Sequence, residues 1–446
     1  MTTSFRFYIR FLSALVSRYY KGILAGIILG ALAFFFSPRI FRLLPPIRPT
    51  QTIGIVAQPT LSDLPLLIQS QLSLGLTGID DTGLAVPALA SSWEATDSGK
   101  TYVFTIQPGL KWQDNSPLTS TDIKYNFRDA QIDYPDSTHL KITLPDPFSP
   151  LPSAVSRPVF KKKLIGVGGY RVTGYKLNGS YVESLTLSPT DQKSTSPVLR
   201  YLFYSSENQA RMAYKLGLVK VLLDIQDPRE LKTWPSTEVS RQLHLDRYTA
   251  AFFNTQAPIF SGLAGRNLRL ALAYAVDKSR WTGSPQIKSP ISAGSWAYYD
   301  QIKTYDFDLD HAKQLLSKVE KIPESITINT VPVYLSLAED IQKDWAALGL
   351  DVQVQVSPDI PSDYQVLLLA QAIPTDPDQY SLWHSTQAGN ITRLNNPRID
   401  KLLEDGRKTL DIEARKSIYA DFQKFLLEES PAIFLFHPHT YTISRQ

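Results

Sequence analysis

A continuous apolar run, YQVLLLA from Tyr364, places the strongest limit on how this chain can fold. A strand with apolar residues at successive positions must be covered on both faces, as in a parallel sheet between helical layers. Two predicted strands precede it, ITINTV from Ile326 and LDVQVQV from Leu350, and between them Leu337 and Ile341 mark an amphipathic helix. The order strand, helix, strand predicts a parallel βαβ lobe.

The rest of the second half is predicted to be mainly helical. Apolar residues recur at helical spacing in segments 266–275, 312–319, 397–403 and 418–426. The apolar segment AIFLF from Ala432 is predicted to be the final strand.

The first half is predicted to be mostly β. Alternating apolar residues predict an antiparallel hairpin over residues 101–112, and further strands are predicted at 139–145 and 180–187. Thr119 followed by Asp122 is a capping-box pattern, which predicts a short helix after the hairpin.

The net charge of +4 comes from the N-terminus of the 446-residue chain. Seven basic residues precede Asp63, the first acidic residue, and the remaining chain carries 39 basic and 42 acidic residues. Affinity for nucleic acid requires many cations that neutralise phosphates. The faintly acidic body therefore argues against a nucleic-acid partner.

Residue types that carry chemistry are scarce. The absence of cysteine excludes disulfides, zinc-thiolate sites, iron–sulfur clusters and a lipid-modified N-terminal Cys. His437 and His439 are the only close pair among six histidines, and without a third ligand they predict polar strand residues rather than a metal site. We find no GxSxG, HExxH or phosphate-loop pattern, so we predict neither an enzyme nor a cofactor.

The N-terminal region is predicted to cross a membrane. Seventeen uncharged residues lie between Lys21 and Arg39, and as a helix they span about 25 Å of a hydrocarbon core about 30 Å thick. Residues 1–21 then form a basic cytoplasmic tail, 22–44 the anchor and 45–50 a Pro-rich spacer, with the body on the extracytoplasmic side. The alternative is a cleaved signal peptide with its cleavage site at residues 31–33.

Gly22, Gly26 and Gly30 recur at every fourth position of the predicted anchor. Such a face allows a second helix to approach closely, which makes a helix-mediated dimer one interpretation. The high frequency of glycine in membrane helices also accounts for the pattern.

The loop after the buried strand is the best site candidate from physical reasoning alone. Ligands of parallel sheets gather beyond the carboxyl ends of the strands, and this loop carries Asp376, Asp378, Tyr380, Trp383 and His384. The two carboxylates are interpreted as loop residues beside a proline, with an acid/base pair as the alternative. The aromatic residues fit either a cleft wall or a core.

Several motifs resemble, in order, the extracellular solute-binding proteins of the peptide/nickel type, family 5 of the ABC-importer binding proteins. The most specific is VPALASSWEATDSGKTYVFTIQPGLKWQDNSPLTSTDIKYNF at residues 86–127. Others are GVGGYRV, FFNTQAPIF followed by LRLALAYAVDKSRW, DLDHAKQLL, IQKDWAALGLDVQVQ, and DPDQYSLWHS with NNPRIDKLLEDG. The resemblance covers residues 51–441.

The resemblance implies a two-lobed α/β fold of the periplasmic-binding-protein type (type II), and the transmembrane helix predicted from the N-terminal residues lies ahead of it. Lobe I is expected at 51–250, lobe II at 251–432, and a return to lobe I at 433–446, with crossings near 248–255 and 433–437. Such proteins capture a peptide or another small solute between the lobes and present it to an ABC permease and its ATPase. Asn254 and Phe436, at the two crossings, become candidate ligand contacts. A membrane-anchored sensor or scaffold with a retained binding fold is the alternative function.

Departures from the family pattern bear on the ligand. Peptide-binding members carry an Asp for the ligand's α-ammonium where this chain has Ile373. Either Asp376 takes over that role or the ligand lacks a free N-terminus. The segment 127–172 is shorter than usual, which predicts a trimmed subdomain beside lobe I.

Overall fold

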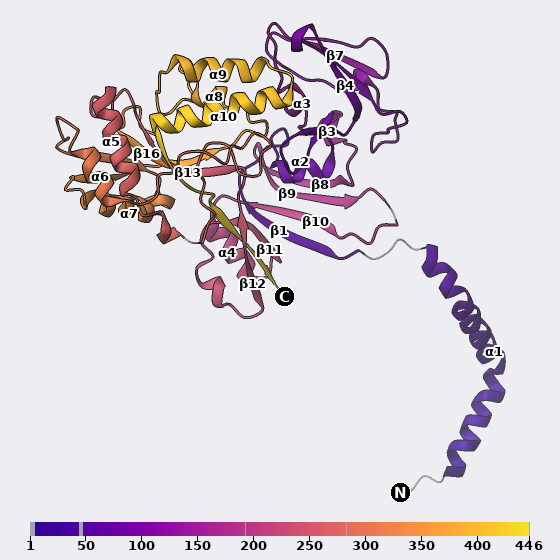
Figure 1. The fold of residues 1–446 in the computed structure, drawn as a ribbon. Coiled ribbons are helices and arrows are strands. Elements are labelled where there is room, and N and C mark those ends of the chain that lie inside the picture. The colour runs from indigo at the N-terminus through magenta and orange to yellow at the C-terminus, as the bar shows by residue number, and fades with distance from the viewer. Residues whose placement is uncertain (1–4, 44–47, 192, 282, 446) are drawn as a thin grey trace.

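The computed structural model describes residues 5–43, 48–191, 193–281 and 283–445. The body is an α/β protein of two lobes, each built on one main sheet (Figure 1). We call the part built on the seven-stranded sheet lobe I and the part built on the five-stranded sheet lobe II. A smaller subdomain beside lobe I contains a four-stranded and a two-stranded sheet.

The lobe I sheet combines parallel and antiparallel pairs. Its order is β12 (Thr237–Leu243), β18 (His439–Arg445), β11 (Val221–Ile225), β1 (Thr50–Val56), β10 (Val198–Tyr204), β9 (Tyr181–Pro189) and β8 (Tyr170–Asn178). β1 runs parallel to both β10 and β11, whereas β18 lies between β11 and β12 and is antiparallel to both. Helices α2 (Leu66–Leu72) and α4 (Glu207–Lys215) contact strands of this sheet.

The subdomain is antiparallel. Its four-stranded sheet has the order β4 (Ala90–Thr96), β5 (Thr101–Ile106), β7 (His139–Thr143) and β6 (Gln131–Asp133), with the β2–β3 pair (Thr77–Ile79 and Ala85–Pro87) and α3 (Leu151–Ala154) beside it. Tyr102, Phe104 and Ile106 share one face of β5 and are buried, as the alternation predicts.

Two local predictions in this subdomain were wrong. The hairpin predicted over 101–112 does not form, because β5 pairs with β4 and β7, and only a single bridge joins Lys111 to Pro117. The helix predicted after the capping box is one 3₁₀ turn, Ser120–Asp122. The Asp122 carboxylate accepts hydrogen bonds from the Thr119 backbone N–H and hydroxyl, and the chain then becomes extended.

Lobe II confirms the predicted βαβ unit. Its sheet order is β15 (Val352–Val356), β14 (Ile326–Thr330), β16 (Val366–Ala372), β13 (Arg247–Phe253) and β17 (Ala432–Phe436), in which β14 is parallel to β15 and β16. Helix α7 (Leu335–Ala346) connects β14 to β15 and buries Ile341 and Trp345. The remaining helices of the lobe are α5 (Gly262–Ala275), α6 (Leu309–Leu316), α8 (Tyr380–Trp383), α9 (Pro397–Lys408) and α10 (Ile412–Glu429).

The chain changes sheets twice at neighbouring places. It leaves lobe I between Leu243 and Arg247, and it returns between Phe436 and His439. The predicted boundary at residue 250 falls inside β13, and the predicted return at residue 433 falls inside β17. The prediction that AIFLF ends the fold was wrong, because β18 follows it and its mixed sequence, HTYTISR, lacks a strong apolar pattern.

The N-terminal segment is helix α1 (Phe5–Leu43), drawn apart from the body in Figure 1. Among the described residues, no single helix is long and apolar enough to cross a membrane. One pair of helical segments, Leu12–Gly22 and Leu24–Leu32, meets the length and composition criteria together, with a bend of 56° between them. Residues 1–4 of the predicted tail and 44–47 of the predicted anchor and spacer lie outside the described residues.

Candidate functional site

All five strands of the lobe II sheet reach the same edge of the sheet. The parallel strands β14, β15 and β16 end there at Thr330, Val356 and Ala372. β13 begins at this edge with Arg247, and β17 ends there with Phe436, because β13 is antiparallel to both β16 and β17. Residues of the loops at this edge line one cavity with the subdomain and another with lobe I.

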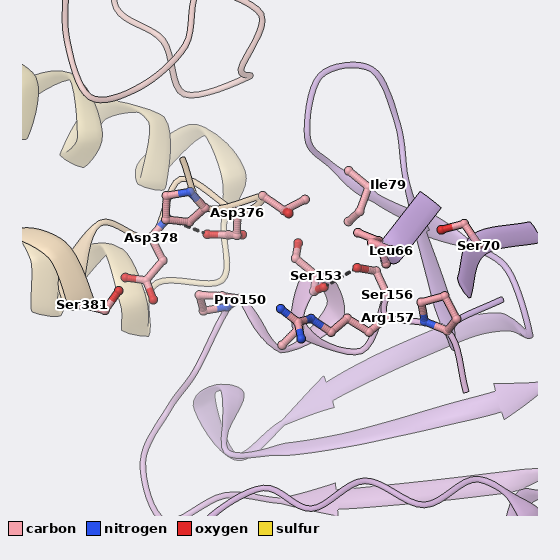
Figure 2. Close-up of a pocket in the computed structure, with 14 residues that line it drawn as sticks. Leu66, Ser70, Ile79, Pro150, Ser153, Ser156, Arg157, Asp376, Asp378 and Ser381 are labelled. Carbon is pink, nitrogen blue, oxygen red and sulfur yellow. Dashed lines mark hydrogen bonds between the residues drawn. The ribbon is translucent and has the colours of Figure 1, made fainter. Parts of the chain in front are cut away.

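The first cavity lies between the loop after β16 and the subdomain, with a volume of about 570 Å³ (Figure 2). On one side it is lined by Pro374–Asp376, Asp378 and Ser381 of lobe II. The other side consists of Leu66 and Ser70 of α2 and residues of the segment 150–158. Its volume lies within the range of about 300–1,000 Å³ that is usual for small-molecule sites.

Both acidic residues of the first cavity are already paired with arginines of lobe II. The Asp376 carboxylate receives two hydrogen bonds from Arg415, at 2.6 and 3.2 Å, and both side chains are at least nine-tenths buried. Asp378 accepts hydrogen bonds from Arg407 at 2.7 and 3.0 Å. Burial raises the pKa of Asp376, and the charge of Arg415 opposes that shift.

Arg157 is the contrasting residue of the first cavity. It is exposed on the segment that leaves α3, and it forms no ion pair with any carboxylate of the described residues. Since Asp376 and Asp378 are each paired with their own arginine, the guanidinium of Arg157 is left as uncompensated positive charge in the wall. Such a group favours a carboxylate or another anion in the cavity.

A second cavity of about 350 Å³ adjoins the first, and Ser153 and Asp376 line both. Its subdomain wall includes Trp93 of β4 and Tyr102 of β5. Burial raises the pKa of Tyr102 to about 12, so this phenol stays protonated and donates a hydrogen bond to the Phe148 carbonyl at 3.1 Å.

A third cavity of about 400 Å³ lies where the chain crosses between the lobes. Arg247, Tyr334 and Phe436 contribute its lobe II side, and His244 and His439 its lobe I side. Burial, with help from nearby positive groups, lowers the pKa of His439. This cavity and the first occupy the same edge of the lobe II sheet.

The structure brings only two of the seven candidate site residues to these cavities. Asp376 lines the first and second cavities, and Phe436 lines the third. Ile373 packs against the lobe II core and donates its backbone N–H to the Asp246 carbonyl at 2.7 Å. The Asn254 amide, 2% exposed, donates to the Tyr364 carbonyl at 2.9 Å.

The aromatic candidates of the loop lie in or against the core of lobe II. Trp383 is 2% exposed and packs between Phe252 and Phe434. Tyr380 stacks on His384, and neither they nor Trp383 line any of the three cavities. Their role in ligand binding, like that of Ile373 and Asn254, stays a prediction.

Sequence reasoning did not identify Arg157, Arg415 or Trp296, although all three line a cavity. One sequence feature could have identified Arg157 as a candidate, since it is a charged residue next to a proline in a loop. Within the residues that the structure describes, no group of three or more His, Cys, Asp or Glu side chains has the arrangement of a metal site.

The family model for bacterial extracellular solute-binding proteins, family 5, matches residues 85–392, more than two thirds of the chain. The chain belongs to this family. Family 5 proteins are extracytoplasmic solute-binding components of ABC importers of the peptide/nickel type, which confirms the resemblance seen in the sequence. They bind solutes and are not enzymes.

Individual relatives of this family 5 protein are distant. The "Probable D,D-dipeptide-binding periplasmic protein DdpA" of Escherichia coli (strain K12) is 23% identical over 78% of each chain. The crystal structure of the ABC transporter substrate-binding protein CtaP from Listeria monocytogenes is 19% identical, with a TM-score of 0.74 over 89% of this chain and 94% of that one. NikZ from Campylobacter jejuni, solved with Ni(L-His), is 22% identical, with a TM-score of 0.71 over the same shares. The solved structures support the two-lobed fold.

Proposed function

We propose that this family 5 protein captures short peptides, or peptide-like solutes, that carry a free carboxylate and no free α-ammonium, and delivers them to an ABC permease. The unpaired guanidinium of Arg157 in the wall of the first cavity is the observation that carries the proposal. A relative such as DdpA is named for dipeptide binding, which supports the peptide class.

The first cavity offers no unpaired carboxylate for the free α-ammonium of a peptide. The resemblance to peptide-binding members puts Ile373 at the position of their ammonium-binding Asp, and this apolar side chain packs against the lobe II core. Asp376 does not replace that Asp, because both of its oxygens are bound by Arg415. An ammonium in the first cavity would then lose water without gaining a carboxylate, which is costly.

Calorimetric titration with blocked and free peptides tests the proposal. We expect N-acetyl-glycylglycine to bind more tightly than glycylglycine, and Arg157→Gln to weaken its binding about 10- to 100-fold, because hydrogen bonds to charged groups contribute about 1.5–3 kcal/mol. Arg128→Gln is the matched control, since Arg128 is also an exposed arginine of the subdomain but lies outside the three cavities. Tighter binding of the free peptide, or unchanged binding in Arg157→Gln, would refute the proposal.

We further propose that α1 tethers the protein to the membrane that holds the permease. The two segments of α1 that together meet the length and composition criteria for a span support this assignment. Fractionation of cells that make the full chain tests it: the protein should sediment with membranes and resist carbonate extraction. A soluble protein whose first residue lies near Phe34 would instead identify a cleaved signal peptide.

A further inference from the structure

The second cavity differs from the first in its chemistry. Trp93, Ala95 and Tyr102 line its subdomain wall from one face of β4 and β5, and Leu410 and Ile412 line the opposite wall before and at the start of α10. The two walls belong to different parts of the molecule, the subdomain and lobe II, which lie side by side in Figure 1.

Apolar surface is left open in this cavity. Leu410 is 40% exposed and Ile412 is 37% exposed, although both are large aliphatic residues. The polar groups around them are mostly engaged, since Tyr102 donates to a backbone carbonyl and Arg415 binds Asp376. A cavity with these walls gains free energy when an apolar group displaces its water.

One polar atom of the second cavity is unsatisfied. The indole N–H of Trp296 is buried and has no hydrogen-bond partner among the described residues. Buried donors normally have partners, so this indole N–H is an exception among the residues that line the cavity. The centroid of the Trp296 ring also lies 5.1 Å from the guanidinium carbon of Arg415, which lines the same cavity.

The position of the second cavity links it to the first. Ser153 and Asp376 line both, so a solute held by Arg157 can extend a side chain past them. We propose that the second cavity accepts an aromatic or branched aliphatic side chain of the captured solute, so that the preferred ligand is amphipathic. This inference rests on the proposed function, and it specifies the substrate class of the same site.

Occupation of the second cavity also favours the closed arrangement of the two walls. The Trp296 backbone N–H donates to the Thr82 carbonyl at 3.0 Å, and the Ser149 N–H donates to the Arg407 carbonyl at 2.8 Å, joining the same two parts. A side chain that contacts both walls binds only when they are together, and it therefore shifts the population toward closure.

Calorimetry on the full chain with two probes tests this proposal. N-acetyl-phenylalanylglycine and N-acetyl-glycylglycine have the same carboxylate and differ in one phenyl side chain. We expect the phenylalanyl probe to bind at least tenfold more tightly, the gain that burial of one large apolar side chain produces. In Ala95→Phe, which fills the cavity, the ratio of the two affinities should fall to about one.

Two control variants distinguish the effect of filling the second cavity from a general loss of folded structure. Glu94→Phe introduces the same side chain on the opposite face of β4 and should keep the ratio of the parent protein. Ile412→Ala removes apolar wall from a residue that is more than one-third exposed, so the fold is retained, and we expect the ratio to fall about threefold or more.

The outcomes distinguish this proposal from the proposed function. The second-cavity proposal would be overturned by equal affinity of the parent protein for both probes. It would also be overturned if the ratio of the two affinities were undiminished in both Ala95→Phe and Ile412→Ala. Neither result would contradict the proposed binding of a carboxylate by Arg157. If neither probe binds the parent protein, both proposals are overturned. The second-cavity proposal is supported if the two probes differ tenfold in affinity, and if Ala95→Phe abolishes this difference while Glu94→Phe preserves it.

Discussion

The buried ion pair between Asp376 and Arg415 provides the most discriminating test of the site. The sequence allows Asp376 to be a ligand contact, whereas the structure binds both of its oxygens to Arg415. Asp376→Asn should therefore destabilise lobe II, because it leaves the Arg415 charge buried without a counter-ion. Loss of one partner of a buried pair costs about 3–5 kcal/mol.

That cost is measurable by urea unfolding. With a slope of about 2–3 kcal/mol per molar urea, the midpoint that tryptophan fluorescence reports should fall by about 1–2.5 M. Arg415 also donates to the Gly406 carbonyl at 2.9 Å and to the Tyr419 hydroxyl at 3.2 Å, so Arg415→Met should be at least as damaging. The double variant should be more stable than Arg415→Met, because neither charge is then buried alone.

A matched ion pair on the surface is the control. The Lys176 ammonium lies 2.8 Å from the Glu183 carboxylate, close to the 2.6 Å between Arg415 and Asp376. The side chains of Lys176 and Glu183, however, are 68% and 44% exposed. Glu183→Gln should change stability by less than about 1 kcal/mol. The reasoning is refuted if Asp376→Asn unfolds within about 0.5 kcal/mol of the parent protein while ligand binding is lost, which would give Asp376 the ligand role instead.

Two further predictions follow from backbone packing and from a buried lysine. Gly166→Ala should destabilise lobe I by about 1–3 kcal/mol in thermal unfolding, because its new Cβ would lie 2.0 Å from the Leu72 carbonyl oxygen, whereas Gly169→Ala meets no atom within 4 Å and should be neutral. Burial lowers the pKa of Lys278 to about 8, so the unfolded chain binds more protons than the native one between about pH 8 and 10, and stability should rise with pH across that window. In urea titrations at several pH values, Lys278→Met should lose this rise, and equal pH slopes in both proteins would contradict the assignment.

Local patterns were sufficient for lobe II. The apolar run that begins at Tyr364 and the helical spacing of Leu337 and Ile341 act over a few residues, and they predicted a βαβ unit that the structure confirms. The helical spacing over 397–403 likewise predicted a helix, which the structure contains as α9, and the Asn396 side chain accepts hydrogen bonds from its first turn.

Local sequence patterns could not predict which distant strands pair with each other. β5 pairs with β7 across some forty residues rather than with its own continuation, because alternation specifies a strand face and not a partner. The candidate site shows the same limit. The aromatic residues Tyr380 and Trp383 follow a buried strand, but their place in the core depends on β13 and β17, which are remote in sequence. Arg157 and Trp296 reach their cavities only through the tertiary fold.

The position of β18 determines when lobe I can be completed. This strand lies in the interior of the sheet, hydrogen-bonded to β11 on one side and β12 on the other. Until the chain has been made as far as Arg445, β11 and β12 present unpaired edges, and edges of this kind invite pairing with other chains. The seven-stranded sheet therefore cannot be completed before the residues of β18 have been made. Loss of β18 would leave β11 and β12 each with an unpaired edge, and such edges favour aggregation.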